Sequence, residues 1–173
     1  MNQNFNRFGR GPRRPREVSE FKEKTLEIRR VTRVMAGGKR FSFRASVVLG
    51  DLKGRVGFGV AKGLDVASAI SKAKLKAKKN MIRIPLKDNR TLYYDVEAKY
   101  GAAVVRLKPA RLNHGLIAGG AARPVLELAG VKDVSAKIMG RTTNKISNAR
   151  ATLEALKKIK VPEKKQENAT PQS

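Results

Sequence analysis

The chain has 173 residues, with 39 lysines and arginines against 14 aspartates and glutamates, and a formal net charge of +25. It has no cysteine and one histidine, which excludes disulfides and thiolate metal sites and argues against a histidine zinc site or a Ser-His-Asp triad. No apolar run is long enough to span a bilayer or to act as a secretory signal. A folded body with this charge attracts polyanions, so nucleic acid is the leading partner and a membrane surface is the rival.

The two ends of the chain differ in composition from its middle. Residues 1–20 are polar and rich in proline and glycine, and the first sixteen carry five arginines and no acid. This composition predicts a disordered basic arm. Residues 161–173, "VPEKKQENATPQS", predict a disordered tail. Between the two ends, the break at "PLKDNRT" predicts a boundary near Lys87 and two small domains, residues 21–86 and 87–160.

The first domain begins with three segments that alternate with period two: "LEIRRVTRV", "RFSFRASVVLGD" and "GRVGFGVA". They predict an antiparallel meander with one packed face and one face in water, joined by the turns "MAGGKR" and "GDLKG". In the middle segment, the side predicted to be packed consists of Phe41, Phe43, Ala45, Val47 and Leu49. The side predicted to face water consists of Ser42, Arg44, Ser46 and Val48.

An amphipathic helix follows in "GLDVASAISKAKLKAKKNMIRI", with Asp65 as its N-cap. At 3.6 residues per turn, one sector of the helix is apolar and comprises Val66, Ala69, Ile70, Ala73, Ala77 and Met81. Another sector is basic and comprises Lys72, Lys76, Lys79 and Arg83. The first domain is therefore predicted to be a β-β-β-α unit.

The second domain is predicted to be a β-β-α-β-α unit, which makes the whole chain α+β. Strands are expected in "TLYYDVEAKY", "AAVVRLKPA" and "VKDVSAKIMG". A glycine-rich loop, "RLNHGLIAGGAAR", runs into a helix in which Pro124 stands early and which Gly130 ends. The last helix covers "TTNKISNARATLEALKKIK", with a hydroxyl of Thr142 or Thr143 as its cap.

The first domain has little acid to balance its cations. Only Asp51 offsets the basic residues of the hairpin, and the helix adds five lysines with no acid between Asp65 and Asp88. Lysine and arginine often protect strand edges, but an ordinary surface mixes signs, so the pattern favours a phosphate backbone. Gly37 and Gly38 would let a partner approach the main chain. Gly57 and Gly59, in "GFG", suit either such an approach or a bulge or bend in the strand.

The glycine-rich loop "HGLIAGGAAR" is typical of an anion site at a helix start, where Arg111, His114 and Arg123 would assist. It lacks the Walker pattern, and a turn without a ligand is the alternative. Asp95 and Glu97 share a strand face as a metal pair would, but a solvated pair is the more usual case. No catalytic residue, metal site or cofactor is predicted. Aromatic residues are few, which favours recognition of structured RNA through its shape and phosphates.

Two long segments carry a resemblance to a known family. "GGKRFSFRASVVLGDLKGRVGFGVAKGLDVASAISKAKLKAKKNMIRI" resembles the first domain of the S-five family of bacterial small-subunit ribosomal proteins. "LKPA", with "GLIAGGAARPVLELAGVKDVSAKIMGRTTNKISNARATLEAL", resembles its second domain, so the likeness covers Phe21 to Lys160. The resemblance implies a first domain related to the double-stranded-RNA-binding fold. It also implies a left-handed β-α-β crossover in the second domain, against the usual right-handed rule.

The resemblance further implies a structural, non-enzymatic component of the cytoplasmic ribosome that has no cofactor and no membrane partner. Such a protein would bind small-subunit rRNA at the junction of body and head and contact ribosomal proteins four and eight. It would support translational accuracy with protein four and line the mRNA entry channel. The turn of Gly37, Gly38 and Lys39 matches the loop associated with spectinomycin sensitivity.

Charge pattern and resemblance together predict one set of rRNA-binding residues. The set comprises Gly37, Gly38, Lys39, Arg40, Arg44, Lys53, Arg55, Lys62, Lys72, Lys76, Lys79, Arg106, Lys108, Arg111, Asn113, His114, Gly119, Gly120 and Arg123. One alternative is an RNA-modifying or phosphotransfer enzyme with a nucleotide at the glycine-rich loop, although the Lys-Ser/Thr phosphate motif is missing. Another is a protein that coats DNA, although two domains with asymmetric basic faces favour a shaped partner.

Overall fold

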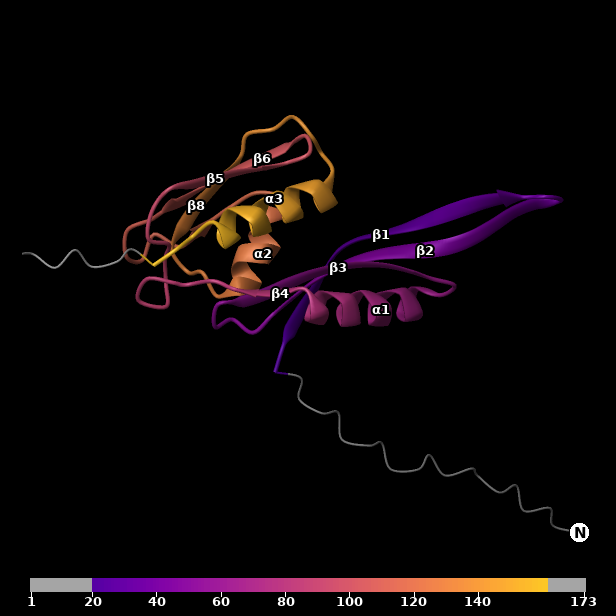
Figure 1. Ribbon diagram of the computed structural model, residues 1–173, viewed down its shortest axis with the longest axis horizontal. Helices are drawn as coiled ribbons and strands as arrows, with labels where there is room; N and C mark the ends of the chain where they lie inside the picture. The colour runs from indigo at the N-terminus through magenta and orange to yellow at the C-terminus, as the bar shows by residue number, and fades with distance from the viewer. Residues whose placement is uncertain (1–19, 162–173) are drawn as a thin grey trace, which may run out of the picture.

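The computed structural model describes residues 20–161, so the predicted basic arm and tail lie almost entirely outside the described residues. Figure 1 shows two sheets with three helices packed on and between them. The first sheet has the strand order β1-β2-β3-β4 and the second the order β5-β6-β8-β7. This arrangement confirms the α+β class. In the described part, no helix is long and apolar enough to cross a membrane.

The first unit consists of one antiparallel sheet and one helix. Its strands are β1 (Lys22–Met35), β2 (Gly38–Gly50), β3 (Arg55–Gly63) and β4 (Met81–Arg83), and helix α1 (Val66–Lys79) lies between β3 and β4 in the chain. The predicted three strands and helix are confirmed, and the short strand β4 was not predicted. The far end of the β1–β2 hairpin projects well beyond α1 (Figure 1).

Helix α1 covers one face of the first sheet. It starts at Asp65 as predicted, and the Ser68 hydroxyl completes a capping box with that residue. Its buried alanines pack on the sheet very closely, because a Cβ at Gly59 would lie 2.1 Å from the Ala73 carbonyl oxygen. A Cβ at Gly57 would likewise lie 2.2 Å from the Ala77 carbonyl oxygen. The expected approach of a partner to residues 57–59 was therefore wrong, since the glycines admit α1 instead, and the unbroken β2–β3 register shows no bulge there.

The face of the first sheet that lies opposite α1 was predicted to be in water, but part of it is buried. Val48, Val56 and Phe58 are buried in the main core together with Val125 and Leu126 of the second unit. Helix α2 packs between this face and α3 (Figure 1). The sheet is therefore covered on both sides at this end, and the two units share one core.

The prediction that Phe41 is packed was also wrong. Its side chain lies on the projecting part of the hairpin and is 47% exposed. The Arg30 guanidinium stands 4.7 Å from the ring centroid of Phe41, so the ring is covered by a cation rather than by the core.

The second unit contains a mixed sheet and two helices. Its strands are β5 (Val96–Tyr100), β6 (Ala103–Pro109), β7 (Leu116–Ile117) and β8 (Val134–Ile138). Helix α2 (Ala122–Ala129) connects the parallel pair β7 and β8, and α3 (Lys145–Lys157) follows β8. Gly130 ends α2 with a φ of 83°, as predicted.

Three details of the second unit differ from the sequence expectation. The strand expected from Thr91 starts only at Val96, and β7 lies inside the predicted glycine-rich loop. The cap of α3 is Asn144, whose Oδ1 accepts a hydrogen bond of 3.1 Å from the Ile146 amide, and neither threonine takes that role. An asparagine side chain satisfies the same free amide hydrogens as a threonine, so the local signal did not distinguish the candidates.

Candidate nucleic-acid interface

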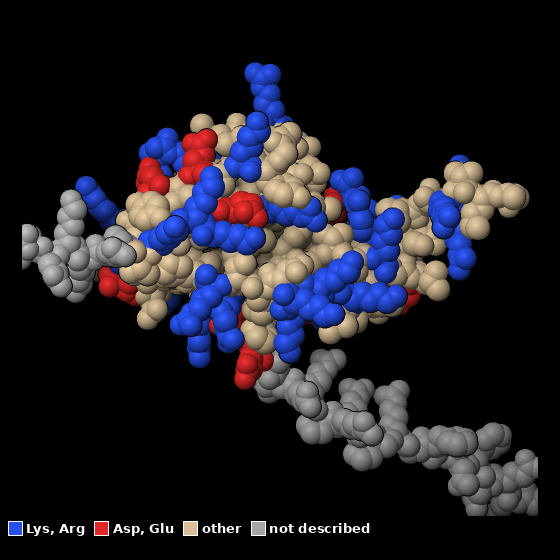
Figure 2. Space-filling model, in the orientation of Figure 1, with Lys and Arg blue, Asp and Glu red and all other residues tan. Residues whose placement is uncertain are grey.

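The basic sector of α1 is the most one-sided group of charges in the first unit. Lys72, Lys76 and Lys79 are exposed, and within the described residues none of their side chains has a hydrogen bond or ion pair. Figure 2 shows lysine and arginine side chains gathered over α1 and the adjoining part of the β1–β2 hairpin, with few acidic side chains among them. An unneutralised ridge of this kind is suited to phosphates.

Two other lysines of α1 have partners within the protein. Lys74 forms an ion pair with Glu23 of β1, with 2.6 Å between Nζ and Oε2. The Lys78 ammonium lies 5.8 Å from the ring centroid of Phe21. Because these two cations are partly satisfied, the three predicted lysines of the basic sector are the ones left free. Arg83, the fourth predicted member of that sector, lies on β4 and not on α1.

The turn between β1 and β2 is open on every side. Gly37 has a φ of 81° and Gly38 a φ of 154°, and a Cβ at either position would meet no atom within 4 Å. The glycines thus supply the backbone conformation of the turn. Lys39 and Arg40 are exposed beside them, and Arg33 lies directly opposite Arg40 in the strand pairing.

Arg55 differs from the free lysines of α1 because it is bound to Asp51. The carboxylate of Asp51 accepts hydrogen bonds from the amides of Lys53 and Arg55, at 2.8 and 2.9 Å, and from Arg55 Nε at 2.6 Å. Burial raises the pKa of Asp51, but these hydrogen bonds outweigh it and leave that pKa below its usual value. Arg55 therefore holds the β2–β3 loop, while the Lys53 side chain remains exposed.

Arg44 and Lys62 lie opposite each other on β2 and β3, and Arg29 of β1 lies opposite Arg44. Arg29 is not among the residues predicted from the sequence to bind rRNA. Its position across from Arg44 depends on the register of the hairpin, which the alternation alone does not fix.

Two predicted cations of the second unit are on β6. Arg106 Nη2 and Lys108 Nζ lie 3.3 and 3.9 Å from Oδ2 of Asp95. All three side chains are about half exposed, so this is a surface ion pair of small energetic weight. Asp95 thus pairs with cations, and it lies just before β5 rather than on a strand face with Glu97. Within residues 20–161 no group of three or more histidines, aspartates and glutamates is placed to hold a metal ion.

The glycine-rich loop is shaped by Asp133, a residue that the sequence analysis missed. The Asp133 carboxylate is almost fully buried and accepts hydrogen bonds of 3.0 Å from the Gly115 amide and from Arg90 Nε. Arg90 also donates to Oδ1 of Asn113 at 3.0 Å. The bond from Gly115 and the charge of Arg90 outweigh burial and hold the pKa of Asp133 below its usual value. The only local signal was an aspartate in front of an apolar strand.

The remaining predicted residues surround this loop. Arg111 and His114 are exposed, and so are Gly119, Gly120 and Arg123 at the start of α2. The N-cap position of α2 is Ala121, which makes no side-chain capping bond. The structure therefore places the predicted set in separate groups: the hairpin turn, the α1 ridge, the β2–β3 loop, the facing pair Arg44 and Lys62 on β2 and β3, β6 and the glycine-rich loop.

Comparison with known proteins identifies both parts of the chain. Residues 21–85 match the family model "Ribosomal protein S5, N-terminal domain", and residues 98–169 match "Ribosomal protein S5, C-terminal domain". The protein named "Small ribosomal subunit protein uS5" of Sulfurihydrogenibium sp. is 52% identical over 147 residues, which are 85% of this chain and 75% of the relative. Its namesake in Persephonella marina is 51% identical over 152 residues, which are 88% and 77% of the two chains. Two family models in the expected order and relatives of this similarity establish that the chain belongs to the ribosomal protein S5 family.

Proposed function

We propose that this chain binds small-subunit rRNA through cations that its own acids leave unpaired, chiefly the ridge of Lys72, Lys76 and Lys79. As a member of the S5 family, the chain is a structural constituent of the small ribosomal subunit and not an enzyme. The observation that carries the proposal is the absence of any ion pair on this ridge within the described residues. In the glycine-rich loop, by contrast, Asp133 serves the fold, which leaves it unavailable for phosphotransfer.

The physical driving force is the release of counterions from RNA. Each phosphate that a lysine neutralises frees condensed cations, so the logarithm of affinity falls with the logarithm of salt by about 0.9 per contact on a duplex. The free ridge of α1 and the open hairpin turn are suited to such contacts, because neither has to break an internal ion pair first. Arg55, which is bound to Asp51, would have to give up that pair.

The finer assignments follow the family resemblance. We place the binding region at the junction of body and head, with ribosomal proteins four and eight as protein neighbours and mRNA at the entry channel. Arg106, Lys108 and the loop around Asn113 and His114 would contact RNA and the surface shared with protein four, where accuracy is set. The turn of residues 37–39 would form the spectinomycin-associated loop, and Arg44, Lys53 and Lys62 would add phosphate contacts along the first sheet.

A map of protected nucleotides tests this proposal. Small subunits are reconstituted with the wild-type chain or with Lys72→Gln/Lys76→Gln/Lys79→Gln, and backbone cleavage of the rRNA is compared. We expect protection at the body–head junction, lost beside α1 in the variant. Lys87→Gln/Lys132→Gln/Lys160→Gln removes the same charge from other exposed positions and should leave that protection intact. Protection at an unrelated region, or equal protection by both variants, would contradict the proposal.

A further inference from the structure

A row of like charges crosses the first sheet on the face that turns toward α3. The strand register sets Arg29 opposite Arg44, and Arg44 opposite Lys62. Residues directly opposite each other share a face, and like charges in that position are destabilising. Arg29 is compensated by Glu27, with 2.7 Å from Nε to Oε1, but Arg44 and Lys62 have no ion pair within the described residues. Arg44 and Lys62 therefore lack an anion.

The same row borders a hollow of about 610 Å³ between the two units. Arg29 and Arg44 line it from the first sheet, and Arg150 lines it from α3. Hydroxyl groups and the start of α3 complete the wall, through Thr142, Thr143, Asn144 and Ser147. None of the described residues that line this hollow is acidic. Three guanidinium groups with nearby hydroxyls match the several acceptor oxygens of a phosphate.

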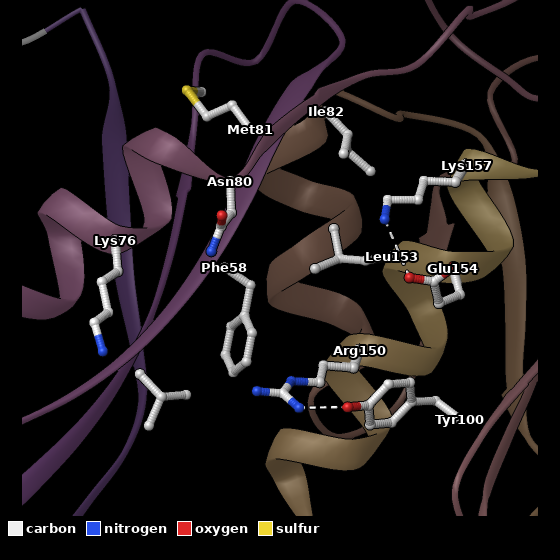
Figure 3. A pocket seen from close by; sticks show the side chains of 11 residues that line it. Phe58, Lys76, Asn80, Met81, Ile82, Tyr100, Arg150, Leu153, Glu154 and Lys157 are labelled. Carbon is white, nitrogen blue, oxygen red and sulfur yellow. Dashed lines mark hydrogen bonds and ion pairs between the residues drawn. The ribbon is translucent and has the colours of Figure 1, made fainter.

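A groove of about 560 Å³ adjoins the hollow and shares Val60, Tyr100 and Arg150 with it. Figure 3 shows Phe58 and Leu153 in this groove, with Arg150 and Tyr100 side by side at one end. The Arg150 guanidinium donates a hydrogen bond to the Tyr100 hydroxyl and lies 5.3 Å from the ring centroid. Besides Arg150 and Tyr100, the polar part of the groove lining comprises Asn80, Lys76, Glu154 and Lys157, and the last two form an ion pair of 3.2 Å. Apolar and aromatic surfaces with a few polar groups at the edge are what a nucleobase requires.

We propose that one unpaired nucleotide of the RNA binds between the two units, with its phosphate among Arg29, Arg44 and Arg150 and its base in the adjoining groove. The inference rests on the proposed function and adds to it a ligand conformation and a site. An acidic peptide is the competing occupant. The nucleotide fits better, because among the described residues three guanidinium groups and no acid line the hollow, while the aromatic and apolar side chains of Phe58 and Leu153 line the groove beside it.

Bound in this way, the phosphate would connect β1 and β2 of the first unit to α3 of the second. It would supply the negative charge that Arg44 and Lys62 lack within the described residues. Binding to the folded form alone also stabilises that form by mass action. The nucleotide would thus fix the two units against each other.

The test uses the full chain bound to small-subunit rRNA that contains 4-thiouridine. After irradiation, mass spectrometry identifies the cross-linked peptides. We expect cross-links on the peptides that contain Phe58 or Tyr100, and at least a tenfold lower yield from Arg44→Gln/Arg150→Gln. The slope of log affinity against log salt should become shallower by about 0.7 for a lost phosphate contact in a single-stranded region. The control Lys87→Gln/Lys132→Gln should keep both the cross-link and the slope.

The outcomes separate this inference from the proposed function. Wild-type binding to rRNA without any cross-link in the groove would overturn the inference and leave the function standing. So would cross-links from Lys76 or Lys157 to acidic residues of a neighbouring protein in the assembled subunit, since a peptide would then fill the groove. A wild-type chain that does not bind rRNA would overturn the function as well. If the double variant folds poorly, Arg44→Lys retains the charge but not the planar fork, and a cross-link yield between wild type and Arg44→Gln is expected.

Discussion

The two ends of the first sheet use the same residue types for different purposes. At the end covered by α1 and α2, Gly57, Gly59 and Phe58 are buried and set how closely helices pack. At the projecting end, Gly37, Gly38 and Phe41 are open to solvent. A glycine or aromatic residue is therefore part of the packed core at one end and of the exposed surface at the other.

The largest effect should come from the buried aromatic ring. Phe58→Ala removes a side chain that is only 6% exposed, and the cavity left in the shared core should lower the free energy of unfolding by about 3–5 kcal/mol. Phe41→Ala, at the projecting end, should cost less than about 1 kcal/mol. Urea titration of both variants measures the difference. Similar losses of unfolding free energy at the two positions would show that the two ends of the sheet do not differ in their contribution to stability.

Glycine substitutions sharpen the same contrast. Gly59→Ala sets a methyl group 2.1 Å from the Ala73 carbonyl oxygen, which forces α1 away from β3 and should cost about 1–3 kcal/mol of unfolding free energy. Gly119→Ala is the matched control, because a Cβ there meets no atom within 4 Å. The control should change stability by less than about 0.5 kcal/mol. Equal thermal shifts for the two variants would refute the close packing of α1.

Gly37→Ala tests the turn at the projecting end. No atom would clash, but the φ of 81° disfavours a Cβ, so we expect a loss of about 1 kcal/mol. Thermal unfolding of the free chain gives this value. A larger loss, similar to that of Gly59→Ala, would mean that the turn contributes to the packed part of the fold.

Acid should weaken the second unit through Asp133. Its pKa is lowered in the folded chain, so its contribution to stability is complete above the ordinary value of 3.8 and is lost as the pH falls through the lower folded value. The stability gap between wild type and Asp133→Asn should therefore be widest at neutral pH and close in acid. Urea titrations across this range measure the gap, and a gap that persists unchanged in strong acid would contradict the assignment. Asp51 should act with the same sign in the first unit.

Local patterns predicted the elements that depend on neighbours in the chain. Asp65 as a cap, the apolar stripe of α1 and the stop at Gly130 all follow from side chains within a few residues. Val48 was assigned to water because nothing in "RFSFRASVVLGD" indicates that α2 covers that face. Strands β4 and β7 were missed because two or three residues are too short for a periodic signal.

The candidate site also combines features that follow from neighbours in the chain with features that only the fold creates. The free ridge of Lys72, Lys76 and Lys79 followed from helical periodicity and from the shortage of acid nearby. The ion pairs of Arg55 and Arg90 could be seen only in the folded chain. The same is true of the hollow that Arg29 and Arg150 both line. Total charge predicted a polyanion partner, but only the pairing pattern shows which cations are free to bind it.

The central claim is that the unpaired ridge of α1 binds rRNA. The most direct measurement is the affinity of the full chain for small-subunit rRNA as a function of salt, for wild type, Lys72→Gln/Lys76→Gln/Lys79→Gln and Lys87→Gln/Lys132→Gln/Lys160→Gln. The ridge variant should keep its thermal stability, and its slope of log affinity against log salt should be shallower by about 0.9 for each lost contact to duplex phosphate. An unchanged slope for the ridge variant, or the same loss in the control, would contradict the account.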